Sequence, residues 1–196
     1  KSTAGASITN LGNDIEKIFV ADTQSGDWIT SFKPNSSGTL YFDWTNNTGT
    51  SVDLTSLTIN EVSIFALKNS GNEPITIPNL NLDPEDTQRI EIGNDNDGDI
   101  ILGAATDLAG TSGLKTISLT TWNDGDIILG TPGTSGLPDL QQLISIALIA
   151  SKTGAITLGD LGENTAINNI SNISIDTQGS AINIGSVNAK KIDNII

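Results

Sequence analysis

The sequence predicts an all-β protein, and three observations support this prediction. Apolar and polar residues alternate with a period of two over many short segments, which is typical of strands with one buried face. Clusters of Asn, Asp, Gly, Ser and Pro, the residues that favour turns, separate these segments. A sequence repeat occurs four times between residues 90 and 185. Each copy has two apolar residues separated by one residue, then a polar stretch with a Gly, then a second such apolar pair that ends in Gly. Many short strands with regularly spaced turns indicate a sandwich, a barrel or a solenoid.

The predicted strands change in composition along the chain. Most of the aromatic residues lie before residue 45, whereas Ile and Leu dominate the later segments. The predicted strands are 17–21, 28–32, 39–44, 52–59, 62–67, 75–77, 89–93, 99–102, 116–121, 126–129, 146–149, 155–158, 170–175, 181–184 and 192–196. The Pro-flanked segment 78–84 is the best candidate boundary. We therefore expect a sandwich-like part over 1–83 and a repeated β region over 84–196, with one continuous domain as the alternative.

The repeat allows two interpretations. Its closing residues Gly103, Gly130, Gly159 and Gly185 are 27, 29 and 26 residues apart. A period of this size is typical of stacked units, each of which cannot bury its apolar face alone. In a solenoid, each period is one coil; in a sandwich, it is a hairpin whose turn is the Asp-Gly of segment 123–126. The sequence leaves both interpretations open for residues 84–196.

Segment 29–54 combines a Pro-containing turn, a Gly, an alternating strand, an Asn-x-x-Gly turn and a further strand. It resembles secreted immunoglobulin-like and jelly-roll sandwiches, including fibre-forming subunits of the TasA and camelysin type and archaeal pilus relatives. This resemblance implies a jelly-roll or immunoglobulin-like sandwich in which a terminal strand completes the sheet of the next subunit. The Gly-x-Ile-x-Leu-Gly unit of segment 154–159 resembles the β-solenoid repeats of S-layer proteins and filamentous-haemagglutinin-type adhesins. Our fold expectation is the sandwich with repeated strand pairs, and a solenoid over 84–196 is the alternative.

Composition excludes several classes of function. The chain has 23 acidic and nine basic residues, a net charge of −14, so its surface repels nucleic acid. It contains no Cys and no His, which removes the thiol nucleophile and the commonest general base. No Ser stands in a Gly-x-Ser-x-Gly motif, and the glutamates show no glycosidase-like pairing. We therefore expect no enzyme activity and no nucleic-acid partner.

Two acidic turns are candidate calcium sites. Segment 94–99 places oxygen ligands at alternate positions around a Gly, and segment 123–126 repeats the pattern one period later. Hard cations such as Ca²⁺ prefer such oxygen ligands, although the same residues also form ordinary solvated turns. The candidate ligands are Asp95, Asp97, Asp99, Asp124 and Asp126. Calcium is the cofactor that the sequence suggests.

Four Asn-x-Ser/Thr motifs are candidate glycosylation sites. They begin at Asn35, Asn46, Asn169 and Asn172.

Two terminal segments are candidate assembly strands, because they are apolar enough to need a covering sheet. Their apolar residues are Ile8 and Leu11 at one end, and Ile192, Ile195 and Ile196 at the other.

These features together predict a secreted structural subunit at the cell surface. No apolar run reaches the roughly 18 residues that a membrane span needs. The absence of an initiator Met fits a chain that has lost an export signal. We expect copies of the chain to assemble into a filament or a surface layer through strand addition or end-to-end stacking. An adhesin module that binds cell-surface glycans is the alternative.

Overall fold

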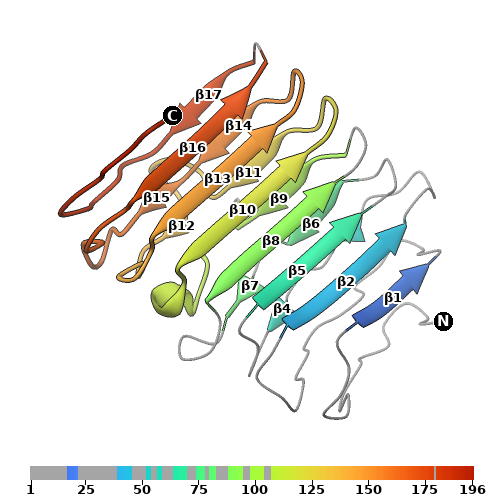
Figure 1. Cartoon of the computed structure of the whole chain (residues 1–196), viewed down its shortest axis with the longest axis horizontal. Helices are drawn as coiled ribbons and strands as arrows, with labels where there is room; N and C mark the ends of the chain where they lie inside the picture. The colour runs from blue at the N-terminus through green and yellow to red at the C-terminus, as the bar shows by residue number, and fades with distance from the viewer. Residues whose placement is uncertain are drawn as a thin grey trace.

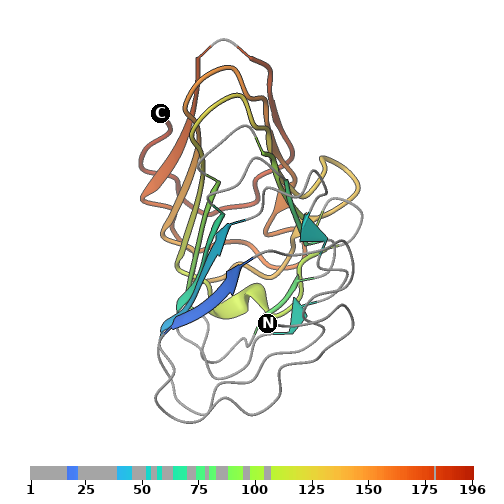
Figure 2. The ribbon, with the colours of Figure 1, turned by 90° about the vertical axis from the view of Figure 1, so that its right-hand side faces the viewer.

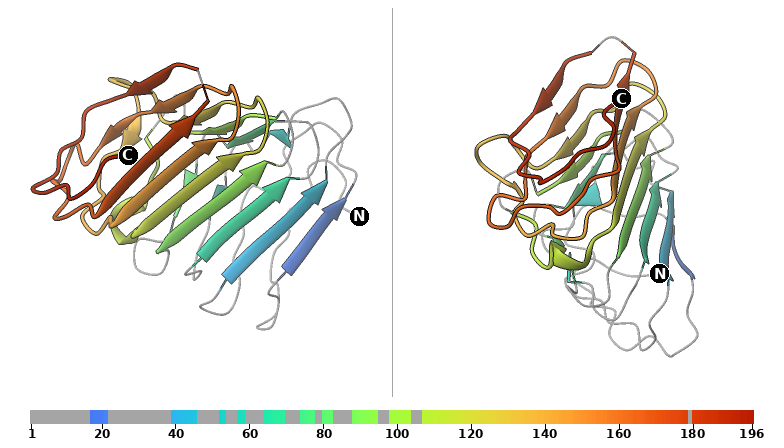
Figure 3. Two further views of the ribbon diagram at one scale, coloured as in Figure 1. Left: turned by 45° about the horizontal axis from the view of Figure 1, so that its top comes forward. Right: turned by 60° about the vertical axis from the view of Figure 1, so that its left-hand side comes forward.

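The computed structural model of this protein is a β-solenoid, in which the chain coils and places equivalent strands side by side (Figure 1). The structure describes residues 17–21, 39–45, 52–53, 57–58, 64–69, 74–77, 80–82, 88–94, 98–103, 107–178 and 180–196. The N-terminal and C-terminal strands lie at opposite ends of the stack of coils (Figure 3). The described strands nearest to the two termini are therefore separated by the whole stack.

The larger sheet has seven parallel strands, and each coil of the described chain contributes one of them. In spatial order they are β1 (Lys17–Ala21), β2 (Thr39–Thr45), β5 (Ile64–Asn69), β8 (Arg89–Asn94), β10 (Thr116–Thr121), β13 (Ser145–Ala150) and β16 (Asn172–Thr177). Because this order follows the sequence, each coil lies next to the coils before and after it.

The second sheet has six parallel strands and faces the first across the core (Figure 2). In spatial order it contains β17 (Ile182–Ile184), β14 (Ile156–Leu158), β11 (Ile127–Leu129), β9 (Ile100–Leu102), β6 (Ile75–Ile77) and β3 (Val52–Asp53). Two short pairs lie between the sheets: β4 (Leu57–Thr58) with β7 (Leu80–Asn81), and β12 (Gly136–Leu137) with β15 (Asp160–Leu161). A 3₁₀ turn, η1, spans Thr111–Gly113.

The predicted jelly-roll or immunoglobulin-like sandwich is wrong. The strands on either side of segment 123–126, β10 and β11, belong to different sheets and do not form a hairpin. Ile117 instead pairs with Ile90 and Ile146, the residues at the same position of the neighbouring repeats. This parallel, in-register pairing defines a solenoid, which was the alternative for residues 84–196. The solenoid also includes the described strands of the first part, where β5 pairs with β8 across the expected boundary.

Stacked isoleucines and leucines form the core. Ile90, Ile117 and Ile146 of the larger sheet are fully buried, as are Ile127 and Ile156 of the second sheet. Full burial of such a side chain contributes roughly 1.5–3 kcal/mol, and in-register pairing repeats this contribution in each of these interior coils. The sequence period therefore matters because it returns the same apolar side chain to the same place.

The corners between the two sheets require residues without a side chain. A Cβ added to Gly154 would lie 2.0 Å from the carbonyl oxygen of Gly125 in the preceding coil. Gly130 adopts a φ of 72°, and a Cβ there would lie 2.7 Å from the Ser135 carbonyl oxygen. The glycines of the repeat thus permit successive coils to turn in close contact.

Candidate functional site

One polar corner joins successive coils through aspartate side chains. Asp99 Oδ1 accepts a hydrogen bond of 2.8 Å from the backbone N–H of Asp126, which lies one coil later. Asp126 Oδ1 accepts an equivalent bond of 2.7 Å from the N–H of Ala155. The backbone repeats the connection, because Ile100 donates to the Asp126 carbonyl and Ile127 donates to the Ala155 carbonyl. These aspartates fix the register of neighbouring coils.

Electrostatics at this corner oppose ionisation of one aspartate. Partial burial raises the pKa of Asp99, and the nearby charge of Asp126 raises it further. The hydrogen bond from the Asp126 backbone lowers the pKa but does not reverse the shift. Asp99 therefore holds the next coil while its charge is disfavoured by the folded environment.

The described aspartates that were predicted to bind calcium form hydrogen bonds within the protein, and calcium binding stays a prediction. Asp99 and Asp126 each use one carboxylate oxygen to bind backbone, and Asp124 Oδ1 accepts from Thr153 Oγ1 at 2.7 Å. That Thr153 bond lowers the pKa of Asp124. Within the part of the chain that the structure describes, no group of three or more acidic side chains is arranged to hold a metal ion. Asp95 and Asp97 lie outside the described residues.

The opposite corner contains an aspartate that sequence reasoning missed. Asp160 Oδ1 accepts from the N–H of Ser186 at 2.7 Å and from its Oγ at 3.0 Å. Asp160 Oδ2 accepts from the N–H of Gly133 at 2.9 Å. The Ser186 bonds lower the pKa of Asp160. Asp160 therefore connects the coil before it with the coil after it, and its position directly after the repeat glycine Gly159 was the available signal.

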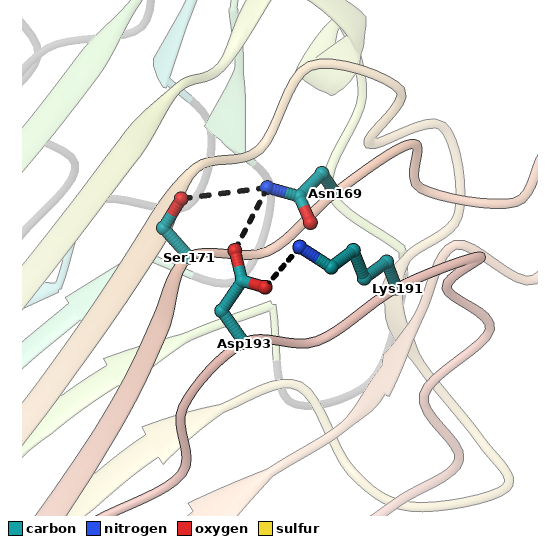
Figure 4. A network of polar contacts seen from close by, with 4 residues as sticks. All are labelled: Asn169, Ser171, Lys191 and Asp193. Carbon is teal, nitrogen blue, oxygen red and sulfur yellow. Dashed lines mark hydrogen bonds and ion pairs between the residues drawn. The ribbon is translucent and has the colours of Figure 1, made fainter.

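The two described glycosylation candidates are both engaged in hydrogen bonds near the C-terminus. Asn169 Nδ2 donates to Ser171 Oγ at 3.5 Å and to Asp193 Oδ2 at 3.3 Å, and Asp193 also pairs with Lys191 (Figure 4). Asn172 Oδ1 accepts from Asn194 Nδ2 at 3.1 Å. Both amides help to hold the final coil, so a glycan on either would compete with these contacts. Asn35 and Asn46 lie outside the described residues.

The most distinctive surface is the C-terminal edge, which we define as β17 and residues 187–196. β17 is the outermost strand of its sheet, and Ile182 and Ile184 are 48% and 44% exposed. Their partners in β14, Ile156 and Leu158, are fully buried. The same apolar positions are therefore covered in one coil and open in the next.

The last residues of this edge pair with β16 of the larger sheet and with the residues just before it. Ile195 pairs with Ile173 of β16, and Ile192 pairs with Ile170. Ile196 is held in the stack through hydrogen bonds between its N–H and the Ile173 carbonyl and between its carbonyl and the Ile175 N–H. Two of the predicted assembly residues, Ile195 and Ile196, are 65% and 71% exposed, whereas Ile192 is partly buried against the core. Ile8 and Leu11 lie outside the described residues.

Comparison with known proteins adds no assignment: no protein-family profile, no curated protein and no solved structure matches this chain. The solenoid fold implied by the Gly-x-Ile-x-Leu-Gly units is confirmed, but a relationship to S-layer or haemagglutinin-type proteins is not shown. The sandwich implied by the resemblance to fibre subunits of the TasA type is contradicted by the parallel strands β1, β2 and β5. Among the described residues, no helix has the length and apolar character of a membrane span.

Proposed function

We propose that this protein is an extracellular structural subunit whose copies assemble end to end through the edges of the solenoid. The observation that supports the proposal is the C-terminal edge, where Ile182 and Ile184 are open although their counterparts in the preceding coil are fully buried. The occupant that fits this edge is another coil of the same protein.

The ladder inside the molecule explains why a second copy fits. β17 presents an Ile-x-Ile pattern close to the Ile-x-Leu pattern that β14 presents to β17, and β14 is covered through parallel, in-register pairing. A strand at the edge of a sheet also exposes backbone groups that pair readily with another strand. A second copy would therefore supply hydrogen bonds and apolar contact together, through contacts that the fold already makes between its own coils.

The chemistry of the surface also fits a structural role. The chain lacks Cys and His, and the acidic side chains of the described corners bind backbone groups of neighbouring coils. These side chains hold the solenoid together and leave no obvious catalytic pair among the residues described. Extracellular placement is part of the proposal and rests on composition.

The test disrupts the apolar face of β17. The double variant Ile182→Asp/Ile184→Asp places two charges where a second copy would bury isoleucine, so it should remain monomeric where the unmodified chain forms filaments or sheets. Ile144→Asp is a matched control, because Ile144 is 47% exposed but lies before β13, away from the C-terminal edge. Negative-stain microscopy and sedimentation velocity measure assembly, and circular dichroism verifies folding.

Assembly by the control but not by the β17 variant would support the proposal. A 196-residue chain that stays monomeric at high concentration would overturn it and favour the glycan-binding alternative, for which the exposed Trp122 is a described candidate. Equal assembly by the β17 variant would also overturn it. The same assay with added Ca²⁺ and with a chelator tests the calcium prediction.

A further inference from the structure

The corner between β10 and β11 contains an aspartate that is followed directly by glycine. Asp124 is exposed, and Gly125 is buried beneath the surface of the corner. Because glycine has no Cβ, its backbone nitrogen can approach the carboxyl group of the preceding residue more closely than that of any other residue type. Elsewhere in the described ranges, no Asp or Asn precedes a Gly. This dipeptide is therefore chemically distinct within the described solenoid.

An Asp-Gly pair can rearrange without an enzyme or a cofactor. The Gly125 nitrogen attacks Cγ of Asp124, so that a C–N bond forms and closes a five-membered ring. A carboxyl oxygen leaves as water, with the amide proton and one proton from the carboxyl group or the solvent. Water then opens the ring at either carbonyl. Opening at the former main-chain carbonyl gives isoaspartate, which has the same mass but carries one more carbon in the main chain.

The following coil holds the carboxyl group that would react. Thr153 Oγ1 donates a hydrogen bond of 2.7 Å to Asp124 Oδ1. Hydrogen bonds to carboxylates are among the stronger ones in proteins, and this one restricts rotation of the side chain towards the Gly125 nitrogen. Thr153 and Asp124 lie on successive coils, so the restriction lasts only while these coils are stacked. We propose that Asp124-Gly125 is a site of spontaneous isomerisation and that Thr153 slows the reaction.

The corner has no space for the longer main chain of the product. The carbonyl oxygen of Gly125 accepts a buried hydrogen bond of 2.7 Å from Thr121 Oγ1. The same oxygen would lie 2.0 Å from a Cβ added to Gly154 of the next coil. Asp126, directly after this dipeptide, holds the Ala155 N–H through its side chain. An additional carbon between Asp124 and Gly125 displaces these groups, so isomerisation weakens the contact between two interior coils.

A timed incubation of the 196-residue chain at constant pH and low protein concentration tests this proposal. Peptide mapping with electron-transfer fragmentation distinguishes isoaspartate from aspartate at position 124. Thr153→Val removes the hydroxyl and should raise the rate of isomerisation severalfold, whereas Thr153→Ser keeps the hydroxyl and should retain the slow rate. Thr157→Val is the matched control, because Thr157 lies in β14 of the same coil and makes no described contact with Asp124. Circular dichroism verifies that each variant is folded.

The urea-unfolded chain supplies the reference rate. Residues 96–99 and 123–126 have the same sequence, Asn-Asp-Gly-Asp, so Asp97 and Asp124 should isomerise at equal rates when no coils are stacked. In the folded chain, position 124 should react more slowly than this reference. Equal rates in folded Thr153→Val and the unmodified chain would overturn the role of Thr153. Absence of isoaspartate at position 124 from folded Thr153→Val, over a time in which the unfolded chain forms it, would overturn the site itself.

Discussion

β14 and β17 carry nearly the same apolar pattern, yet only β14 is buried. Ile156 pairs with Ile182 and Leu158 pairs with Ile184, but the first member of each pair is fully buried and the second is nearly half exposed. The difference arises from position, because β14 has a neighbour on each side and β17 has a described neighbour on one side only. In a solenoid, a repeat contributes to stability in proportion to the coils that cover it.

The interior coils and the last coil, residues 180–196, are also held by different contacts. Interior coils are connected by continuous strand pairing, as in the six residue pairs between β10 and β13. The last coil combines the three residue pairs between β17 and β14 with isolated bridges at Val187, Ala189, Ile192 and Ile195. Side-chain bonds reinforce them, among them those from Asn188 to the Gly162 carbonyl and from Lys190 to Asn168. Polar contacts help to hold this edge, while Ile182 and Ile184 of β17 remain nearly half exposed.

The largest expected effect comes from equal truncations in the two strands. Ile156→Ala creates a cavity in a fully buried site and should lower the free energy of unfolding by about 2–5 kcal/mol. Ile182→Ala removes a half-exposed side chain and should cost about 1 kcal/mol or less in the monomer. Urea denaturation at low protein concentration measures both. Equal losses would show that Ile182 is covered in solution.

A smaller effect is expected at a polar atom inside an interior coil. Thr111 is buried, and its Oγ1 has no hydrogen-bond partner among the described residues. Thr111→Val keeps the shape and removes the unpaired hydroxyl, so it should raise the free energy of unfolding by about 1 kcal/mol. Thr153→Val is the contrasting change, since the exposed bond from Thr153 Oγ1 to Asp124 Oδ1 would be lost. Thermal unfolding of both variants gives the comparison, and destabilisation by Thr111→Val would contradict it.

The smallest effects are expected from pH at the two aspartate corners, and they have opposite signs. The pKa of Asp99 is raised on folding, so its contribution to stability is present in acid and is lost as pH rises through the folded value. The pKa of Asp160 is lowered, so its contribution is present at neutral pH and is lost as pH falls through the folded value.

Substitution by Asn separates these contributions. Asp99→Asn keeps an oxygen acceptor for the Asp126 N–H and removes the charge, so it should stabilise the protein at about pH 7 and lose this advantage in acid. Asp160→Asn presents an amide nitrogen to one of its donors and should destabilise at about pH 7, with a smaller effect in acid. Denaturant titrations across this range measure both variants. A change of the same sign in the free energy of unfolding of both variants at about pH 7 would contradict the opposite pKa shifts of Asp99 and Asp160.

Much of the local structure could be predicted from the sequence. Period-two alternation identified β10 at residues 116–121 without error and placed β8 and β16 to within two residues at each end. The repeat also identified the glycines of the corners, where Gly154 has no room for a Cβ. The pairing of these strands was predicted wrongly, because an Asp-Gly turn is compatible both with a hairpin and with the corner of a coil.

The candidate site was predictable in part. Ile195 and Ile196 are exposed, and their part in assembly stays a prediction, whereas the exposure of Ile182 and Ile184 in β17 was not predicted from the sequence. Asp160 was missed because its three hydrogen-bond donors belong to Gly133 and Ser186, which lie about one coil away on either side. Contacts of that kind depend on how coils stack and leave little trace in the local pattern.

The sequence by itself determined many of the strands, the length of the repeat and the absence of Cys and His. These features depend on side-chain alternation and composition, which are local properties of the chain. The tertiary structure decided that equivalent residues stack in parallel, that aspartates join the coils and that β17 is left open. Those outcomes depend on which strands become neighbours, because pairing between distant residues determines both burial and hydrogen bonding in this fold.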